Sequence, residues 1–147
     1  MKLRIGEPWM VAKEYGQSLI GLTINLLVID MNAALFFQTE VLGAEVVYSD
    51  PDFAVLSGFG GEWMLHADHT YDKHPFGSSL GKMANRGLGI EIRLHGCDPD
   101  KAQLAAETLG FEILAPAKDM GHGLREVYLQ DPDGYTWVPD VVIETES

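Results

Sequence analysis

Leu42-Gly43-Ala44-Glu45-Val46-Val47 and Leu109-Gly110-Phe111-Glu112-Ile113-Leu114 follow one pattern, and this repeat decides the fold. A second correspondence lies downstream, where Glu62-Trp63-Met64-Leu65 matches Thr136-Trp137-Val138-Pro139. Two copies of one unit usually pack about a pseudo-twofold axis and share a cleft. The sequence therefore predicts two similar halves, and the side chains that face the cleft determine what it does.

The first copy reads as one strand, one helix and three further strands. Residues 22–28 alternate in polarity and lead to Asp30, a residue type that caps helix N-termini. Apolar side chains then recur at helical spacing, and Gly43 suits the position that ends a helix. We expect a strand over 22–28, a helix over 31–42, and strands over 45–48, 52–56 and 62–67.

The second copy repeats this order. Asp98 is the expected helix cap, and Pro99 suits the first helical position. Asp131-Pro132-Asp133-Gly134 has the composition of a tight turn between two strands. We expect a strand over 89–95, a helix over 99–109, and strands over 111–114, 124–130 and 135–138. Each module is βαβββ, so the predicted fold class is α+β with a duplicated unit.

A chain of 147 residues has the size of one domain. The repeat subdivides it. We expect an N-terminal arm over 1–18, a first module over 19–68, a polar linker over 69–86, a second module over 87–141 and a C-terminal tail over 142–147.

The net charge of −12, with only 10 Lys and Arg residues, argues against nucleic acid as a partner because a phosphate backbone requires a basic surface. The same charge disfavours anionic membranes and attracts cationic small molecules, although acidity that only keeps a protein in solution is an alternative. The chain has no apolar run long enough for a membrane span and no signal-peptide pattern, so we expect a cytoplasmic protein. The single Cys97 lies in no nucleophile motif and is expected to be structural.

Strands that run into Asp30 and Asp98, the segment Phe37-Gln38-x-x-Val41-Leu42-Gly43 and the turn Asp131-Pro132-Asp133-Gly134-Tyr135 occur here within a doubled βαβββ unit. In this combination the chain resembles the vicinal oxygen chelate superfamily, which includes glyoxalase I, the bleomycin-resistance proteins and extradiol dioxygenases. The resemblance covers residues 19 to about 141. It implies a curved sheet from each module around a shared cavity, and a homodimer.

In metal-dependent members of that superfamily, each module supplies one inward residue early in its first strand and one inward acid on its last strand. Carried onto this chain, the resemblance places these positions at Thr23, Met64, Glu91 and Val138. Zn²⁺, Ni²⁺, Mn²⁺ or Fe²⁺ requires several nitrogen or oxygen donors. One carboxylate, one hydroxyl and one thioether do not form such a set, so we expect neither a metal nor another cofactor.

Strand alternation predicts which side chains face the cavity. Ile24, Leu26 and Val28 are expected to pack on the first helix, and Ile90, Ile92 and Leu94 on the second. Trp63 and Trp137 have the parity of core residues. Glu126 and Gln130 are possible inward residues on the second module's third strand. The ligand-binding candidates are Thr23, Asn25, Met64, His66, Glu91, Arg93, His95 and Tyr128.

The inward row Glu91, Arg93 and His95 has two interpretations. A Glu91–Arg93 ion pair, closed by Asn25, would make the row structural. Alternatively, Glu91 and His95 contact a polar small molecule, and these two are also the catalytic candidates. A relocated metal site that uses His66, His69 or His74 with Glu91 is a further alternative, although solvated loop histidines are commoner. His122 and Arg125 are expected in a loop at the cavity mouth, with His122 solvated.

Together these features favour a metal-free protein that sequesters a cationic or amphipathic small molecule, as in the bleomycin-resistance branch, and that forms a homodimer. The alternative is a lyase, isomerase or dioxygenase with a non-standard metal site, or with His95 or Glu91 as a general base. The fold does not decide between them because the superfamily contains both kinds of protein.

Overall fold

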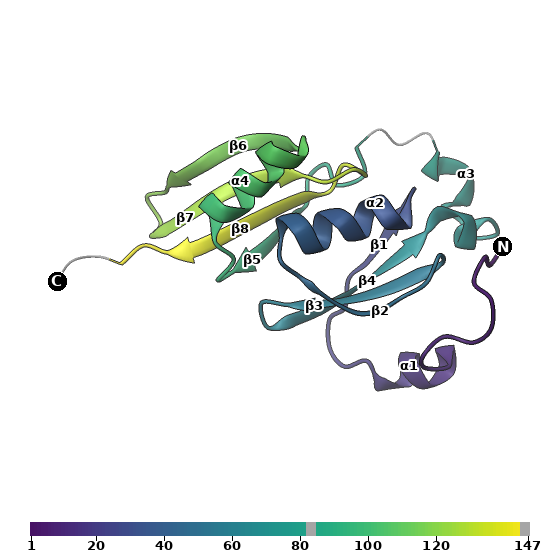
Figure 1. Cartoon of the computed structure of the whole chain (residues 1–147). Helices are drawn as coiled ribbons and strands as arrows, with labels where there is room; N and C mark the ends of the chain where they lie inside the picture. The colour runs from purple at the N-terminus through teal and green to yellow at the C-terminus, as the bar shows by residue number, and fades with distance from the viewer. Residues whose placement is uncertain (82–84, 145–147) are drawn as a thin grey trace.

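The computed structural model describes residues 1–81 and 85–144 (Figure 1). Residues 82–84 of the expected linker and 145–147 of the expected tail lie outside the described residues. Two four-stranded mixed sheets have the orders β1-β4-β3-β2 and β5-β8-β7-β6. The two sheets have the same connectivity, and the predicted α+β fold with a duplicated βαβββ unit is confirmed.

The first module differs from expectation mainly at the start of its first strand and at the end of its helix. Its first strand begins at Asn25, not at residue 22, and the helix ends in a π-helical turn. Asp30 caps the helix by accepting a hydrogen bond from the Ala33 N–H, as predicted. The elements are β1 (Asn25–Val28), α2 (Met31–Phe36), η1 (Phe37–Val41), β2 (Glu45–Ser49), β3 (Phe53–Gly58) and β4 (Gly61–Ala67).

The second module follows the predicted order, with two strands longer than expected. Asp98 caps α4 through the N–H groups of Asp100 and Lys101, and Gly110 ends the helix with a φ of 82°. Only a residue without a Cβ adopts that backbone conformation without strain. The elements are β5 (Glu91–His95), α4 (Pro99–Leu109), β6 (Glu112–Asp119), β7 (Leu124–Gln130) and β8 (Thr136–Val142).

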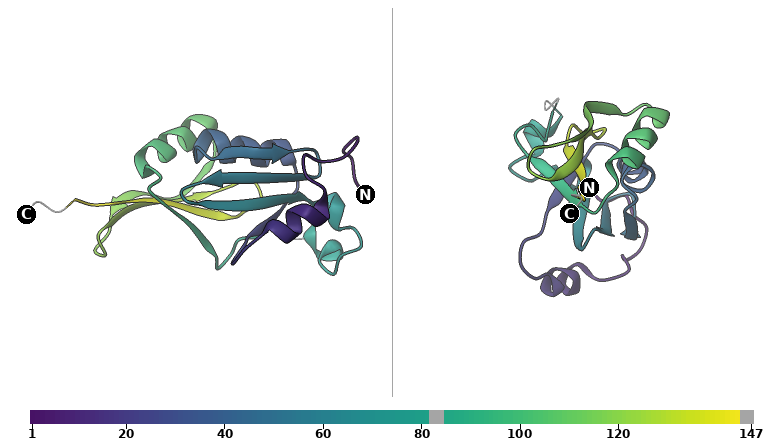
Figure 2. Two further views of the ribbon diagram at one scale, coloured as in Figure 1. Left: turned by 90° about the horizontal axis from the view of Figure 1, so that it is seen from below. Right: turned by 90° about the vertical axis from the view of Figure 1, so that its left-hand side faces the viewer.

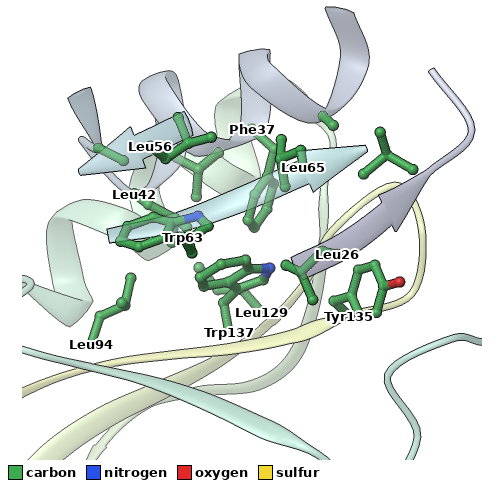
Figure 3. Close-up of a cluster of buried hydrophobic side chains, with 14 of the residues drawn as sticks. Leu26, Phe37, Leu42, Leu56, Trp63, Leu65, Leu94, Leu129, Tyr135 and Trp137 are labelled. Atoms are coloured by element: carbon green, nitrogen blue, oxygen red, sulfur yellow. The ribbon is translucent and has the colours of Figure 1, made fainter. Parts of the chain in front are cut away.

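The two modules share one hydrophobic core (Figure 3). Trp63 of β4 and Trp137 of β8 occupy corresponding positions in the repeat, and their ring centroids lie 5.7 Å apart. Both side chains are buried, which confirms that they are core residues. Equivalent residues meet where a twofold axis passes between two copies, so this contact marks the pseudo-twofold axis.

The N-terminal arm contains a short helix that the sequence did not predict, α1 (Ala12–Ser18). The arm lies on the face of the first sheet opposite to α2 (Figures 1 and 2). The linker contains η2 (Asp68–Tyr71) and α3 (Gly77–Leu80). Within residues 1–81 and 85–144, no helix has the length and apolar character needed to cross a membrane.

The turn between β7 and β8 joins the two modules. The Asp133 carboxylate accepts a hydrogen bond from the Ile29 N–H at 2.8 Å, and the Tyr135 hydroxyl donates to the Leu27 carbonyl at 3.0 Å. Arg86 also donates to the Leu27 carbonyl and pairs with Asp68. Because Asp133 is buried, its pKa is raised to about 6.

We predict that Asp133 makes stability depend on pH. The folded chain binds a proton at Asp133 near pH 6, whereas the unfolded chain binds it near the ordinary value of 3.8. The free energy of unfolding should therefore rise as pH falls between these values. When the pH falls from 7 to 5, the free energy of unfolding of wild type should rise by about 1 kcal/mol more than that of Asp133→Asn. The asparagine keeps an acceptor for the Ile29 N–H. Urea denaturation of both proteins at both pH values measures this difference, and equal changes would contradict the prediction.

Candidate functional site

The predicted site residues fall into two groups, one in each module. Asn25, Met64 and His66 lie on β1 and β4 of the first sheet, and Glu91, Arg93, His95 and Tyr128 lie on β5 and β7 of the second. Thr23 precedes β1 and is exposed, so it is not an inward strand residue. The cavity that Met64 and His66 line includes no member of the second group.

The second group surrounds Arg93 on the face of the second sheet opposite to its core face. In the sheet register Arg93 lies beside Val138 and His95 beside Asp140, while Glu126 of β7 lies on the other side of Asp140. The Arg93 guanidinium binds the buried carboxylate of Glu126 and approaches Asp140 at 3.1 Å and Glu91 at 3.7 Å. We call Glu91, Arg93, His95, Glu126, Tyr128 and Asp140 the acidic face.

The acidic face keeps an excess of negative charge. Burial is the largest single influence on Glu126 and opposes its ionisation, but the hydrogen bond and charge of Arg93, together with His122, hold the pKa of Glu126 below its ordinary value. The same hydrogen bond is the largest cause that raises the pKa of Arg93. A hydrogen bond with Glu91 is the main cause of the raised pKa of Tyr128. Three carboxylates thus contact one guanidinium, and one cation does not neutralise them.

His95 is held by a buried acid and opens to solvent. Its Nδ1 lies 2.8 Å from the Asp140 carboxylate, and its side chain is 69% exposed. A carboxylate at Nδ1 orients the imidazole and leaves Nε2 available to a ligand. His122 lies in a turn and its side chain is 53% exposed, as expected, and its Nε2 lies 3.4 Å from Glu126 at the margin of the acidic face. Arg125 pairs with Asp100 and Asp119 instead of lining the face.

The expected Glu91–Arg93 pair is present, but only as a long contact, and the prediction that Asn25 closes it is wrong. Asn25 bonds to His66 at 2.5 Å and to the Tyr71 hydroxyl at 2.9 Å, within the first module. The main partners of Arg93 are Glu126 and Asp140. The sequence analysis missed Asp140 because it ended the strand at Val138, before a proline that usually does not sit in a strand interior.

Two members of the first group, Met64 and His66, lie under the N-terminal arm, whereas Asn25 lines a separate cavity that also receives Ile92 and Tyr135 of the second module. Met64 and His66 line a cavity of about 300 Å³ between the arm and the first sheet. All residues that line it lie between Lys2 and Thr70, so the second module contributes none. Desolvation lowers the pKa of His66, which favours the neutral imidazole.

The two faces occupy corresponding positions of the repeat but have opposite chemistry. Asn25 precedes the cap Asp30 by the same interval by which Arg93 precedes Asp98. Beside His66 in the first sheet lies Phe53, and beside the corresponding Asp140 in the second sheet lies Glu126. The first face therefore has an imidazole and an aromatic ring at the two positions where the second face has buried carboxylates.

The residues at the superfamily's metal positions do not fit a metal ion. Thr23 lies outside the sheet, Met64 offers a thioether and Val138 offers no donor, which leaves the carboxylate of Glu91. Across the described part of the chain, no three His, Cys, Asp or Glu side chains are grouped so as to hold a metal. His69 of the alternative site instead contacts Asp52 at 2.6 Å. Burial raises the pKa of Cys97 to about 12, so this thiol stays protonated at neutral pH.

Known structures share this fold at low sequence identity. A glyoxalase/bleomycin resistance protein/dioxygenase from Nocardioides is 22% identical, with a TM-score of 0.62 over 90% of this chain and 93% of that one. The fosfomycin resistance protein FosX from Listeria monocytogenes is 21% identical, with a TM-score of 0.62 over 85% of this chain and 95% of that one. TioX from Micromonospora sp. ML1 is 19% identical, with a TM-score of 0.61 over 87% of this chain and all of that one.

No curated protein sequence matches the chain. The family model of the Glyoxalase/Bleomycin resistance protein/Dioxygenase superfamily, however, matches residues 22–138, which span both βαβββ modules. With that match and the duplicated fold, the chain belongs to the Glyoxalase/Bleomycin resistance protein/Dioxygenase superfamily.

Proposed function

We propose that this chain is a cytoplasmic, metal-free protein that binds and sequesters a small cationic or amphipathic molecule at the acidic face. The observation that carries the proposal is the set of three carboxylates around Arg93. Glu126 and Asp140 are buried and hold the guanidinium between them. The acidic face is therefore ordered before a ligand binds, and its excess of negative charge favours a cationic ligand.

Glu91 is the carboxylate best placed to receive the ligand. Its side chain is 46% exposed, and its 3.7 Å contact with Arg93 is too long for a hydrogen bond. A cation at Glu91 would not need to displace Arg93, and a carboxylate that accepts a hydrogen bond from the Tyr128 hydroxyl keeps further lone pairs for a ligand. The exposed His95 lies on the same strand and the same face, which gives the ligand a second polar contact.

We predict that Glu91→Gln weakens binding of a cationic ligand roughly tenfold to a hundredfold. A hydrogen bond to a charged group contributes about 1.5–3 kcal/mol, and the substitution removes the charge while keeping the shape. Calorimetric titration with basic glycopeptides and amphipathic amines measures the effect. Glu40→Gln, which removes an exposed carboxylate from η1 of the first module, is the matched control and should bind as wild type does.

A purely structural Glu91 would give the opposite pattern. Glu91→Gln would then lower the melting temperature and leave binding unchanged. Tight binding of anions through Arg93 and His95 would show that the sign assigned to this face is wrong.

We further propose that the protein acts as a homodimer. β1 and β5 are edge strands of their sheets, and the segments that lead into them expose large apolar side chains. Leu22 is 93% exposed and Leu88 is 83% exposed. A second copy that covers these side chains would remove them from water. In such a dimer, one module of each chain would pack against a module of the partner chain.

The dimer is tested by light scattering. Wild type at micromolar concentration should give twice the chain mass of 16.2 kDa, and the double variant Leu22→Asp/Leu88→Asp should shift toward the single chain. Leu104→Lys changes an exposed leucine on α4, the helix that packs against β6, β7 and β8, and should remain dimeric. A wild-type mass near 16.2 kDa would refute the homodimer.

The second candidate function is acid–base catalysis, as in a lyase or isomerase, and the His95–Asp140 contact favours it. A buried carboxylate that orients an exposed imidazole is the arrangement of a general base. The candidate predicts turnover that survives metal removal and is lost in His95→Gln. Metal analysis of protein purified without chelator, together with substrate screens of both proteins, tests it. Turnover that requires added metal would exclude His95 alone as the catalyst.

A further inference from the structure

The N-terminal arm is fastened to the first module by the buried carboxylate of Asp52. This carboxylate accepts hydrogen bonds from the N–H groups of Leu3 at 2.7 Å and Arg4 at 3.1 Å. It also contacts His69, at 2.6 Å. The terminal ammonium of Met1 donates to the His69 carbonyl at 2.6 Å. The start of the arm is therefore fixed mainly through its backbone.

An aromatic cluster fixes the next part of the arm. The ring of Trp9 stacks on Tyr48 at a centroid distance of 4.5 Å and lies 6.3 Å from Phe53. Tyr15 of α1 is buried and meets Phe53 edge-on at 5.5 Å. These contacts hold the arm across the first sheet as the outer wall of the cavity described above.

The cavity wall is mostly apolar, and one of its polar groups is His66, whose tautomer is fixed by a hydrogen bond. Met10, Leu19, Phe53 and Met64 supply apolar surface. The Nδ1 of His66 lies 2.5 Å from the Asn25 amide oxygen, which only accepts, so this nitrogen carries the proton. The Nε2 of His66 is then an acceptor, and it has no hydrogen-bond partner among the described residues.

A second polar group in the lining is Arg4, whose guanidinium has only a long ion-pair contact. Its side chain is 16% exposed, and its closest acid is Asp52 at 3.9 Å, which already accepts from other donors. In the described part of the chain, the buried Arg4 Nε has no hydrogen-bond partner. A buried donor without an acceptor is costly, and a carboxylate matches the edge of a guanidinium with two parallel hydrogen bonds. Lys2 and Asp52 also line the cavity, so two cationic side chains face one carboxylate, and the excess of one positive charge favours an anionic ligand.

We propose that the arm and the first sheet form a binding site for a small aromatic carboxylate. The carboxylate pairs with Arg4, the ring packs against Phe53 and the two methionines, and a hydroxyl on the ring donates to Nε2 of His66. A volume of about 300 Å³ suits one or two rings. The site is independent of the acidic face, because no residue of the second module lines it.

The test is calorimetric titration with benzoate, 3- and 4-hydroxybenzoate, indole-3-carboxylate and, as the charge-reversed probe, benzylamine. Wild type should bind the acids and not benzylamine, and a hydroxybenzoate should bind more tightly than benzoate. Arg4→Met keeps the backbone bond to Asp52 and the apolar stem, and should weaken acid binding at least tenfold. Lys13→Met removes a cation from the same arm outside the cavity and should leave binding unchanged.

Three results would overturn the proposal: no acid bound by wild type at millimolar concentration, equal affinities in wild type and Arg4→Met, or a preference for benzylamine. Equal affinities for benzoate and both hydroxybenzoates would remove His66 from the site. Near-ultraviolet circular dichroism shows whether the arm stays in place in each variant, with Trp9→Phe as the reference that separates the Trp9 signal from those of Trp63 and Trp137. Glu91→Gln should not change acid binding, so this site and the acidic face can fail separately.

Discussion

The contact between the two halves of the core sets the rest of the structure. Each sheet buries one face beneath its helix, and these faces meet where Trp63 contacts Trp137. A sheet has only two faces, so the other face of each is left for water, an arm or a ligand. The first sheet is covered by the N-terminal arm, and the second presents the acidic face.

The fold could be predicted because the repeat and the strand periodicity are local sequence patterns that indicate which side chains are buried. Asp30 and Asp98 cap the helices as predicted, and both tryptophans lie in the core. The errors occur where tertiary contacts replace local signals. The α1 helix has no clean periodicity of its own and is stabilised by Trp9 and Tyr15 against Phe53.

The sequence predicted only part of the candidate site, for a related reason. Alternation identified Glu91, Arg93 and His95 on one face of their strand, as the structure has them. It did not identify which groups from other strands approach Arg93, because pairing between strands distant in the sequence fixes that. Asp140 was not predicted because Pro139 suggested that the strand ended before it. The residues around Asp52 and Arg4 have no sequence pattern that predicts a contact between the arm and the sheet.

The way Asp52 holds the arm has an evolutionary consequence. Because the carboxylate grips backbone N–H groups, every residue except proline at positions 3 and 4 can supply the same attachment. The side chains of this segment are thus not required for its attachment to the first module. A lineage could change what the arm presents to the first sheet by single substitutions, without first inventing a new way to keep the arm in place.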